Sequence, residues 1–230
     1  MADPTPLSGI DTFLASSVHD MKNSISVLIG GLEKTLAEVD PALFPAGVDM
    51  AHMIYETRRI NNNLIQLLTL YKTGHSLYPF DPQAQSVADE LRLIGEQNRA
   101  LAVSRSIAIE LVADEDLYWE FDEDLIGGVI GNALNNAIHY TQDCIRLIAS
   151  ETDGMLEIRV EDNGKGYPQM MLDAGVEAMR GVDFLGGSTG LGLHFSAVAA
   201  KMHRNRGRSG EIKLENGGSL GGGCFILRLP

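Results

Sequence analysis

The sequence predicts an α+β protein in two parts: an N-terminal helical hairpin that forms a dimeric four-helix bundle, followed by an α/β sandwich with a mixed sheet. Apolar residues first repeat at helical spacing over two long segments. A stretch that contains Gly74, Pro79 and Pro82 breaks this pattern, and strand-like alternation mixes with helical segments beyond it. We therefore assign residues 1–75 to the hairpin and residues 80–230 to the sandwich.

The hairpin is predicted from two amphipathic helices, at residues 11–37 and 48–72. Asp11 suits the N-cap of the first helix, and Pro41 and Pro45 follow its end. The short link DPALFP favours an antiparallel arrangement. The second helix carries a heptad stripe of Met53, Thr57, Ile60, Leu64, Leu67 and Tyr71. A stripe this continuous indicates that two hairpins pair into a four-helix bundle; packing of the hairpin on its own C-terminal part is the alternative.

The sandwich is predicted from a mixture of helices and strands, with the helices on one face of the sheet. Helices are expected at residues 87–104 and 122–140, and a third starts near Gly190. The expected strands are 107–111, 117–121, 156–160, 211–215 and 224–229.

Composition and charge limit the partners and the location of the protein. The formal net charge of −13 repels phosphate backbones and anionic lipids, so we expect neither a nucleic acid nor a membrane as partner. The one basic cluster, Arg204, Arg206 and Arg208, is interpreted as a solvated loop. No apolar run approaches the roughly 20 residues that span a bilayer, and Cys144 and Cys224 read as reduced core residues. We expect a cytoplasmic protein.

The first polar motif is GNALNNAIHYT, residues 131–141, on a predicted helix. Asn132 and Asn136 are four positions apart and share one helix face. Asparagine is a poor helix former, so this stretch lowers helix stability. Its side-chain carbonyl is a hard oxygen ligand that suits Mg²⁺, although solvated surface asparagines explain the pattern equally well.

The second motif is VEDNGKGYP, residues 160–168, where a predicted strand ends in Asp162. Gly164 and Gly166 allow a sharp turn and a close approach of the backbone to a ligand. An aspartate at this position can accept a hydrogen bond from an exocyclic amine; an ordinary turn is the alternative.

The third motif is GGSTGLGLHFS, residues 186–196, where Gly190 and Gly192 lead into a predicted helix. The N-terminus of such a helix offers unpaired N–H groups and the positive end of the helix dipole to phosphate. The motif lacks the G-K-[ST] of a Walker loop.

The order of these motifs resembles the ATP-binding domain of the histidine kinase superfamily, which gyrase, Hsp90 and MutL share. NALNNAIHYT is similar to its N-box, DNGKG to its first glycine box, TGLGL to its second, and GGGCFILRLP to its last strand. The resemblance covers residues 80–230. It implies an α/β sandwich that binds ATP.

The stretch HDMKNSI near the N-terminus is similar to the H-box of histidine kinases, H-[DE]-x-x-[NT]. His19, Asp20 and Asn23 share one face of the first predicted helix, as in the dimerisation and phosphotransfer domain of that family. Ser24 stands where the family usually has proline, so the proline that kinks this helix is missing.

The resemblance implies a nucleotide site with ATP and Mg²⁺ as cofactors. Asp162 would bind the adenine amine, and Asn136 would hold Mg²⁺ with help from Asn132. His139 would contact a phosphate and Tyr140 would line the adenine pocket. The two glycine boxes would shape the site, with Gly190 and Gly192 cradling phosphates. Residues 167–189 would form the lid, in which Arg180 is the one cation.

The resemblance also implies a reaction and its partners. The Nε2 atom of His19 would attack the γ-phosphoryl group, while Asp20 orients the ring through Nδ1–H. The phosphoryl group would then pass to an aspartate in the receiver domain of a response regulator, and Asn23 would orient water in the reverse, phosphatase reaction. The protein would be a homodimer without its own sensor, which receives input from a separate sensor protein or from a domain outside this chain.

Two other classes of protein remain open at this point. A histidine phosphotransfer protein has the same two domains and uses no ATP, but its glycine boxes decay, whereas those of this chain are intact. A dimeric scaffold or an anti-sigma-type Ser/Thr kinase would leave His19 without a purpose.

Overall fold

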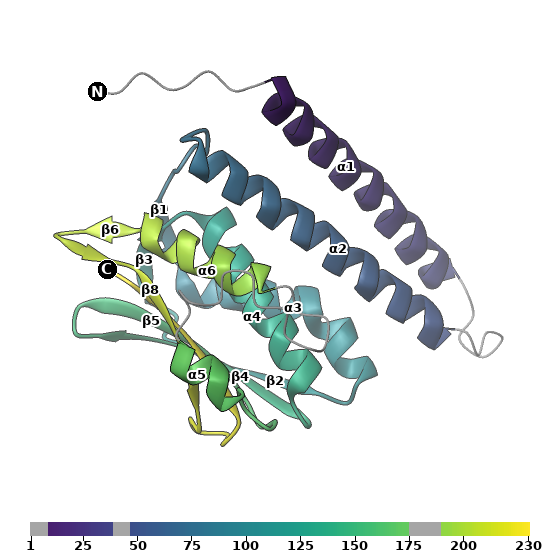
Figure 1. Cartoon of the computed structure of the whole chain (residues 1–230). Helices are drawn as coiled ribbons and strands as arrows, with labels where there is room; N and C mark the ends of the chain where they lie inside the picture. The colour runs from purple at the N-terminus through teal and green to yellow at the C-terminus, as the bar shows by residue number, and fades with distance from the viewer. Residues whose placement is uncertain (1–8, 39–46, 175–189) are drawn as a thin grey trace. The chain divides into compact units, whose positions relative to one another are not determined.

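The computed structural model describes residues 9–38, 47–174 and 190–230. The chain divides into two compact units, Met1–Pro79 and Phe80–Pro230 (Figure 1). In the described ranges, no helix combines the length and the apolar character that crossing a membrane requires.

The first unit is a helical hairpin of α1, Gly9–Glu38, and α2, Gly47–Gly74, which lie side by side (Figure 1). Both predicted helices are confirmed. An ion pair between Glu33 and Arg58 joins them. Helix α1 runs unbroken through Ser24, whose hydroxyl donates to the Asp20 carbonyl oxygen at 3.0 Å. Many large apolar side chains of this unit are exposed: Met21, Val27, Leu28, Met53, Ile60, Ile65 and Leu67.

The second unit is built on a five-stranded sheet with the order β2-β4-β5-β9-β8. Its strands are β2 Ala108–Val112, β4 Cys144–Thr152, β5 Met155–Asp162, β8 Glu211–Asn216 and β9 Gly223–Leu229. Strand β2 runs parallel to β4 and the other pairs are antiparallel, so the predicted mixed sheet is confirmed. One face is covered by three helices (Figure 1), namely α3 Val87–Ser104, α4 Glu123–Tyr140 and α6 Leu191–Met202.

Short elements surround this sheet. Strand β1, Gln83–Ser86, pairs with β3, Tyr118–Phe121, in a separate two-stranded sheet, so the strand predicted at 117–121 lies outside the main sheet. Strands β6, Arg204–Asn205, and β7, Arg208–Ser209, form a hairpin where the sequence suggested a loop. A short helix, α5 Gln169–Ala174, follows the loop after β5.

The core lies between the sheet and the helices. On β5, Leu156, Ile158 and Val160 alternate with charged residues and are at most 2% exposed. They meet the apolar face of α4, which includes Leu134 and Ile138. Burying each such side chain contributes roughly 1.5–3 kcal/mol. This packing fixes α4 over the strand whose end carries Asp162.

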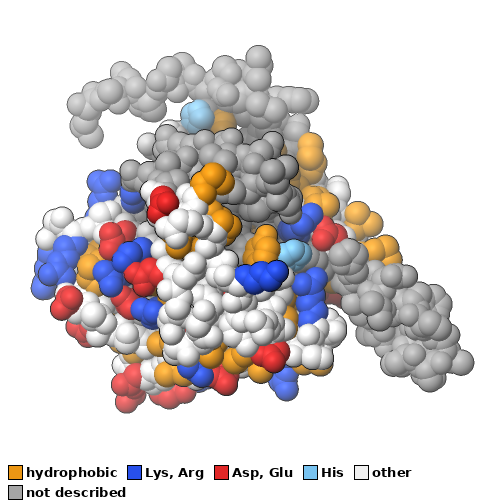
Figure 2. Space-filling view, turned by 60° about the horizontal axis from the view of Figure 1, so that its bottom comes forward, with side chains coloured by type: hydrophobic (Ala, Val, Ile, Leu, Met, Phe, Trp, Pro, Cys, Tyr) orange, Lys and Arg blue, Asp and Glu red, His pale blue; other side chains and the backbone are white. Residues whose placement is uncertain are grey.

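The opposite face of the sheet carries paired charges. Arg159 bridges Glu157 and Glu161 on its own strand, and Arg228 of β9 pairs with Glu157. Burial opposes ionisation of Glu161, but hydrogen bonds from Ser219 and Arg159 lower its pKa below the usual value. Figure 2 likewise shows cationic and anionic side chains interspersed on one face of the molecule. The carboxylates of this sheet face are thus held by their own ion pairs.

Candidate functional site

A polar stripe runs along α4 opposite its buried face. It consists of Asn132, Asn135, Asn136, His139 and Tyr140, all half-buried or exposed, while the alternate residues are buried. The His139 and Tyr140 rings meet edge to face with centroids 4.9 Å apart. Among the described residues, the three asparagine side chains make no hydrogen bond. Their amides are therefore open to a ligand.

The start of α6 lies directly against this stripe. Gly190 is buried and has a left-handed backbone with φ +65°. A Cβ atom at Gly192 would lie 2.2 Å from Asn132 Nδ2, and one at Gly128 would lie 3.2 Å from the Phe195 ring. At both positions α4 and α6 leave little room for a side chain, because Gly192 faces the tip of the Asn132 side chain and Gly128 faces the Phe195 ring. The N-box and the second glycine box are thus in contact through Asn132 and Gly192.

The end of β5 holds a buried carboxylate. Asp162 is 7% exposed, and its Oδ1 atom accepts hydrogen bonds from the N–H groups of Gly164 at 2.7 Å and Gly223 at 3.1 Å. A Cβ atom at Gly223 would lie 2.7 Å from Asp162 Oδ2. The first glycine box and the start of β9 therefore fix the carboxylate from two sides.

Asn163 joins the end of α4 to the end of β5, a role that was not predicted from the sequence. Its Oδ1 atom accepts from the Thr141 hydroxyl at 2.7 Å and from the N–H groups of Gln142, Asp143 and Cys144 at 3.1–3.2 Å. Its Nδ2 atom donates to Asp143 Oδ1 at 2.7 Å. An asparagine inside D-N-G was the available signal, because asparagine commonly bonds backbone groups in turns.

Gly164 extends the same contact through the backbone. A Cβ atom there would lie 2.2 Å from the Tyr140 carbonyl oxygen at the end of α4. No side chain larger than hydrogen fits without displacing the helix. This contact fixes the position of Asp162, at the end of β5, relative to the asparagine stripe on α4.

Asn216 fixes the loop beyond Gly166. Its Oδ1 accepts from the Tyr167 N–H at 2.7 Å, and its Nδ2 donates to the Tyr167 carbonyl at 2.9 Å. Gly166 has φ +75°, and a Cβ atom there would lie 2.6 Å from Asn216 Oδ1. Burial, with Asp162 and Cys224 nearby, raises the pKa of Tyr167 above its usual range, so its phenol stays neutral.

Some predicted residues lie elsewhere in the chain. His19, Asp20 and Asn23 lie in the middle of α1, in the first unit, and the Asp20 and Asn23 side chains are exposed. Residues 175–189, the larger part of the expected lid with Arg180, fall outside the described residues.

Comparison with known proteins agrees with this geometry. Residues 121–230 match the family of histidine kinase-, DNA gyrase B-, and HSP90-like ATPases, a range that runs from the start of α4 to the end of β9. The chain is also similar along its length to sensor histidine kinases. The chain thus carries a histidine kinase catalytic core. The similarity to AfsQ2, which covers 95% of this chain, extends over both units.

Individual relatives give the extent of this likeness. The chain is 27% identical over 238 residues to the signal transduction histidine-protein kinase AfsQ2 of Streptomyces coelicolor, covering 95% of this chain and 41% of that protein. It is 30% identical over 219 residues to the sensor histidine kinase ZraS of Escherichia coli, covering 94% of this chain and 44% of that protein. The chain thus spans less than half the length of these two kinases.

Solved structures support the fold. Full-length ShkA in complex with AMPPNP superposes with a TM-score of 0.64 and 20% identity, over 95% of this chain and 45% of ShkA. The catalytic domain of the histidine kinase ThkA superposes with a TM-score of 0.54 and 20% identity, over 65% of this chain and 95% of that domain. The sandwich is therefore a fold found in the catalytic domain of a histidine kinase.

Proposed function

We propose that this chain is an ATP-dependent protein histidine kinase that phosphorylates itself on His19 and passes the phosphoryl group to the receiver domain of a response regulator. The observation that carries the proposal is the contact of three separate motifs. The asparagine stripe contacts the second glycine box at Gly192. Asn163, the residue after Asp162, accepts a hydrogen bond from Thr141 at the end of the helix that carries the stripe.

The nucleotide fits this constellation by the chemistry of its residues. We assign Asp162 to the exocyclic amine of adenine, because its carboxylate is held rigidly at the end of β5. Tyr140, next to the Asp162 turn, lines the base, and Gly190 and Gly192 present the start of α6 to the phosphates. His139, one turn from Asn136, contacts a phosphate.

Mg²⁺ fits the donor set if most of its ligands come from phosphate and water. Among the described residues there is no group of three His, Cys, Asp or Glu side chains that could hold a metal ion. Mg²⁺ commonly takes only one or two protein ligands. The unbonded amide oxygen of Asn136 suits this role, with Asn132 beside it. When bound, Mg²⁺ supplies neutralisation of phosphate charge.

The phosphoryl transfer is assigned to α1. Neutral His19 attacks the γ-phosphorus of ATP through Nε2, so that an N–P bond forms as the bond to the β,γ-bridging oxygen breaks and ADP leaves. Asp20 accepts a hydrogen bond from Nδ1–H, which fixes the tautomer and favours the positive charge that develops on the ring. Asn23, one turn further along the helix, orients water against the phosphoaspartate of the regulator and gives the phosphatase activity.

Assembly as a homodimer follows from the apolar surface of the hairpin. Val27 is 77% exposed, Leu28 is 59% exposed and Leu67 is 47% exposed. Side chains of this kind, repeated along both helices, suit the core of a four-helix bundle. Of these three, Leu67 belongs to the heptad stripe predicted on α2. The dimer receives its input from a separate sensor protein or a domain outside this chain, and the use of ATP places it in the cytoplasm.

Nucleotide binding separates this function from that of an ATP-independent phosphotransfer protein. Calorimetry with ATP and Mg²⁺ should show binding by the wild type and much weaker binding by Asp162→Asn. Asn136→Ala should lose turnover more than affinity. If the wild type binds no ATP at millimolar concentration, the phosphotransfer function replaces the kinase.

The phosphatase assignment has its own test. Asn23→Ala should autophosphorylate normally and dephosphorylate the regulator slowly, by a factor of roughly 100 for a positioned group. Both reactions are measured on the same sample. Equal loss of the two activities would mean that Asn23 only supports the structure of α1 and has no role of its own in the phosphatase reaction.

A further inference from the structure

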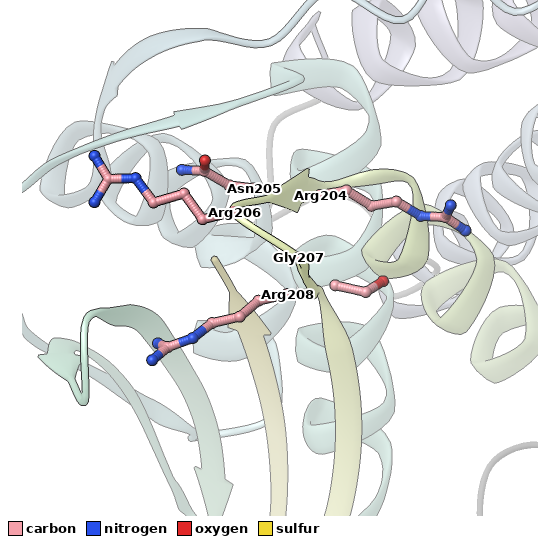
Figure 3. Close-up of a pocket in the computed structure, with 6 residues that line it drawn as sticks. Arg204, Asn205, Arg206, Gly207 and Arg208 are labelled. Carbon is pink, nitrogen blue, oxygen red and sulfur yellow. The ribbon is translucent and has the colours of Figure 1, made fainter.

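The β6–β7 hairpin concentrates positive charge on an acidic protein. Its register pairs Arg204 with Ser209 and Asn205 with Arg208, and Arg206 and Gly207 form the turn. Figure 3 shows the Arg206 and Arg208 side chains extending to one side of the hairpin and Arg204 to the other. The hairpin residues line a shallow hollow of about 370 Å³.

These three arginines have no carboxylate partner among the described residues, whereas seven other arginines of the described chain do. The paired ones are Arg58, Arg59, Arg92, Arg99, Arg146, Arg159 and Arg228. Within the hairpin, Arg208 donates to the Asp153 carbonyl oxygen at 2.7 Å and Arg204 to the Lys201 carbonyl oxygen at 3.2 Å. Neutral carbonyls leave the three positive charges uncompensated.

The turn holds an arginine where the backbone favours other residues. Arg206 has φ +49° and Gly207 has φ +79°, the left-handed pair of a two-residue hairpin turn. Asparagine or glycine is the usual residue at the first of these positions, because a longer side chain is disfavoured there. Arginine at this position is therefore unexplained by the fold.

A second hollow lies beside the hairpin, and its one charged side chain is the carboxylate of Glu120. It measures about 250 Å³ and is lined by Ala84, Tyr118, Trp119, Glu120, Asn205 and Pro230. Asn205 lines both hollows, so they adjoin. Tyr118 is 62% exposed and offers its ring to an apolar side chain.

We propose that this surface, Arg206 and Arg208 together with the Tyr118 hollow, docks an acidic segment of a partner protein that carries an apolar side chain. Guanidinium groups bind carboxylates in paired hydrogen bonds. The formal net charge is −13, so the chain without these three arginines carries −16. An extended polyanion, such as a nucleic acid or a membrane surface, meets that repulsion, whereas a short acidic segment contacts the hairpin alone.

The test uses fluorescence anisotropy of a fluorescein-labelled peptide of glutamates around one phenylalanine. Arg206→Asn removes one charge and suits the left-handed turn, so the variant should melt no lower than the wild type. It should bind the peptide about threefold more weakly, the size of one exposed ion pair. Arg206→Lys keeps the charge but not the paired hydrogen bonds, so its loss of affinity should be smaller than that of Arg206→Asn. Arg99→Gln is the control, because it removes the same charge from α3.

Three results would overturn the docking surface: wild type that does not bind the peptide, equal loss in Arg206→Asn and Arg99→Gln, or tighter binding of oligothymidine or phosphatidylserine vesicles than of the peptide at the same salt. Tyr118→Ser should weaken binding of the peptide that contains phenylalanine and leave the affinity for an all-glutamate peptide unchanged. ATP binding by Arg206→Asn should match the wild type. The docking surface and the kinase function are therefore tested independently.

Discussion

Replacing Asn163 with alanine removes the side chain that joins the end of α4 to the end of β5. Its Oδ1 atom accepts four hydrogen bonds and its Nδ2 atom donates one. The N–H groups of Gln142 and Asp143 are exposed, so water replaces that acceptor with little loss. The Cys144 N–H is partly buried and loses about 1 kcal/mol. The Thr141 hydroxyl also lies 2.8 Å from the Cys144 carbonyl oxygen, which can accept its single proton in the variant. The Nδ2 bond to Asp143 is exposed and adds little, so we expect a decrease in the free energy of unfolding of about 1–2 kcal/mol.

Urea denaturation, monitored by tryptophan fluorescence, measures this loss of stability in the second unit. The chain has one tryptophan, Trp119, on β3 in the second unit. Asn163→Asp keeps an acceptor for the N–H groups but sets a carboxylate against Asp143, so its loss should be intermediate at neutral pH. Asn98→Ala, which removes one bond within α3, is the control and should change stability little.

Nucleotide affinity should fall together with stability, because Asp162 is the next residue along the chain. We expect Asn163→Ala to bind ATP more weakly than Asn98→Ala at a temperature where both remain folded. A change in unfolding free energy below about 0.5 kcal/mol, the range of ordinary surface substitutions, would refute the idea that this carboxamide links the two elements.

Three further substitutions test other parts of the molecule. Gly164→Ala brings a methyl group against the backbone carbonyl at the end of α4 and should destabilise the second unit by about 3 kcal/mol, measured by urea denaturation. Burial, reinforced by two carboxylates in the first turn of α4, raises the pKa of Glu90 to about 7. The stability that this group contributes is therefore full below its unfolded pKa and is lost as the pH rises through 7, so Glu90→Gln should stabilise the protein by about 2–3 kcal/mol at pH 8 and little at pH 5. Leu67→Glu places a charge on a side chain that is 47% exposed in the single chain, so it should leave the helices folded by circular dichroism and convert a dimer to a monomer by light scattering. A wild type of monomeric mass would contradict the four-helix bundle.

The sequence predicted the parts of the site that depend on local spacing. Asn132 and Asn136 share a face because they are four positions apart on a helix, and the structure places both on the same stripe. Gly164 was predicted to allow a close approach of the backbone, and a Cβ atom there would lie 2.2 Å from the Tyr140 carbonyl oxygen.

The sequence did not predict contacts between distant positions. Asn163 bonds the turn about 20 residues earlier, and Asn216 bonds the Tyr167 backbone 49 positions away. Neither pairing produces a periodic pattern. The β6–β7 turn was also missed, because Arg206 occupies a position where asparagine or glycine would have signalled it.

The sequence also did not predict which strands pair with one another in the sheets. The segment 117–121 has strand character, yet β3 pairs with β1 rather than with the main sheet. Strand β4 was not predicted as an element, because it begins four residues after α4 ends and no glycine or proline marks the boundary. Pairing is decided by contacts that local propensity does not encode.

Autophosphorylation of His19 is the most direct test of the central claim. Wild type and His19→Gln are incubated with ATP labelled in the γ-phosphoryl group and Mg²⁺, and the label on the protein is measured after acid and after alkali treatment. The wild type should acquire label that acid removes and alkali leaves, Asp20→Asn should acquire it roughly 100-fold more slowly, and His19→Gln should acquire none. Label of equal amount and stability on His19→Gln would contradict the assignment of this protein as a kinase that acts through His19.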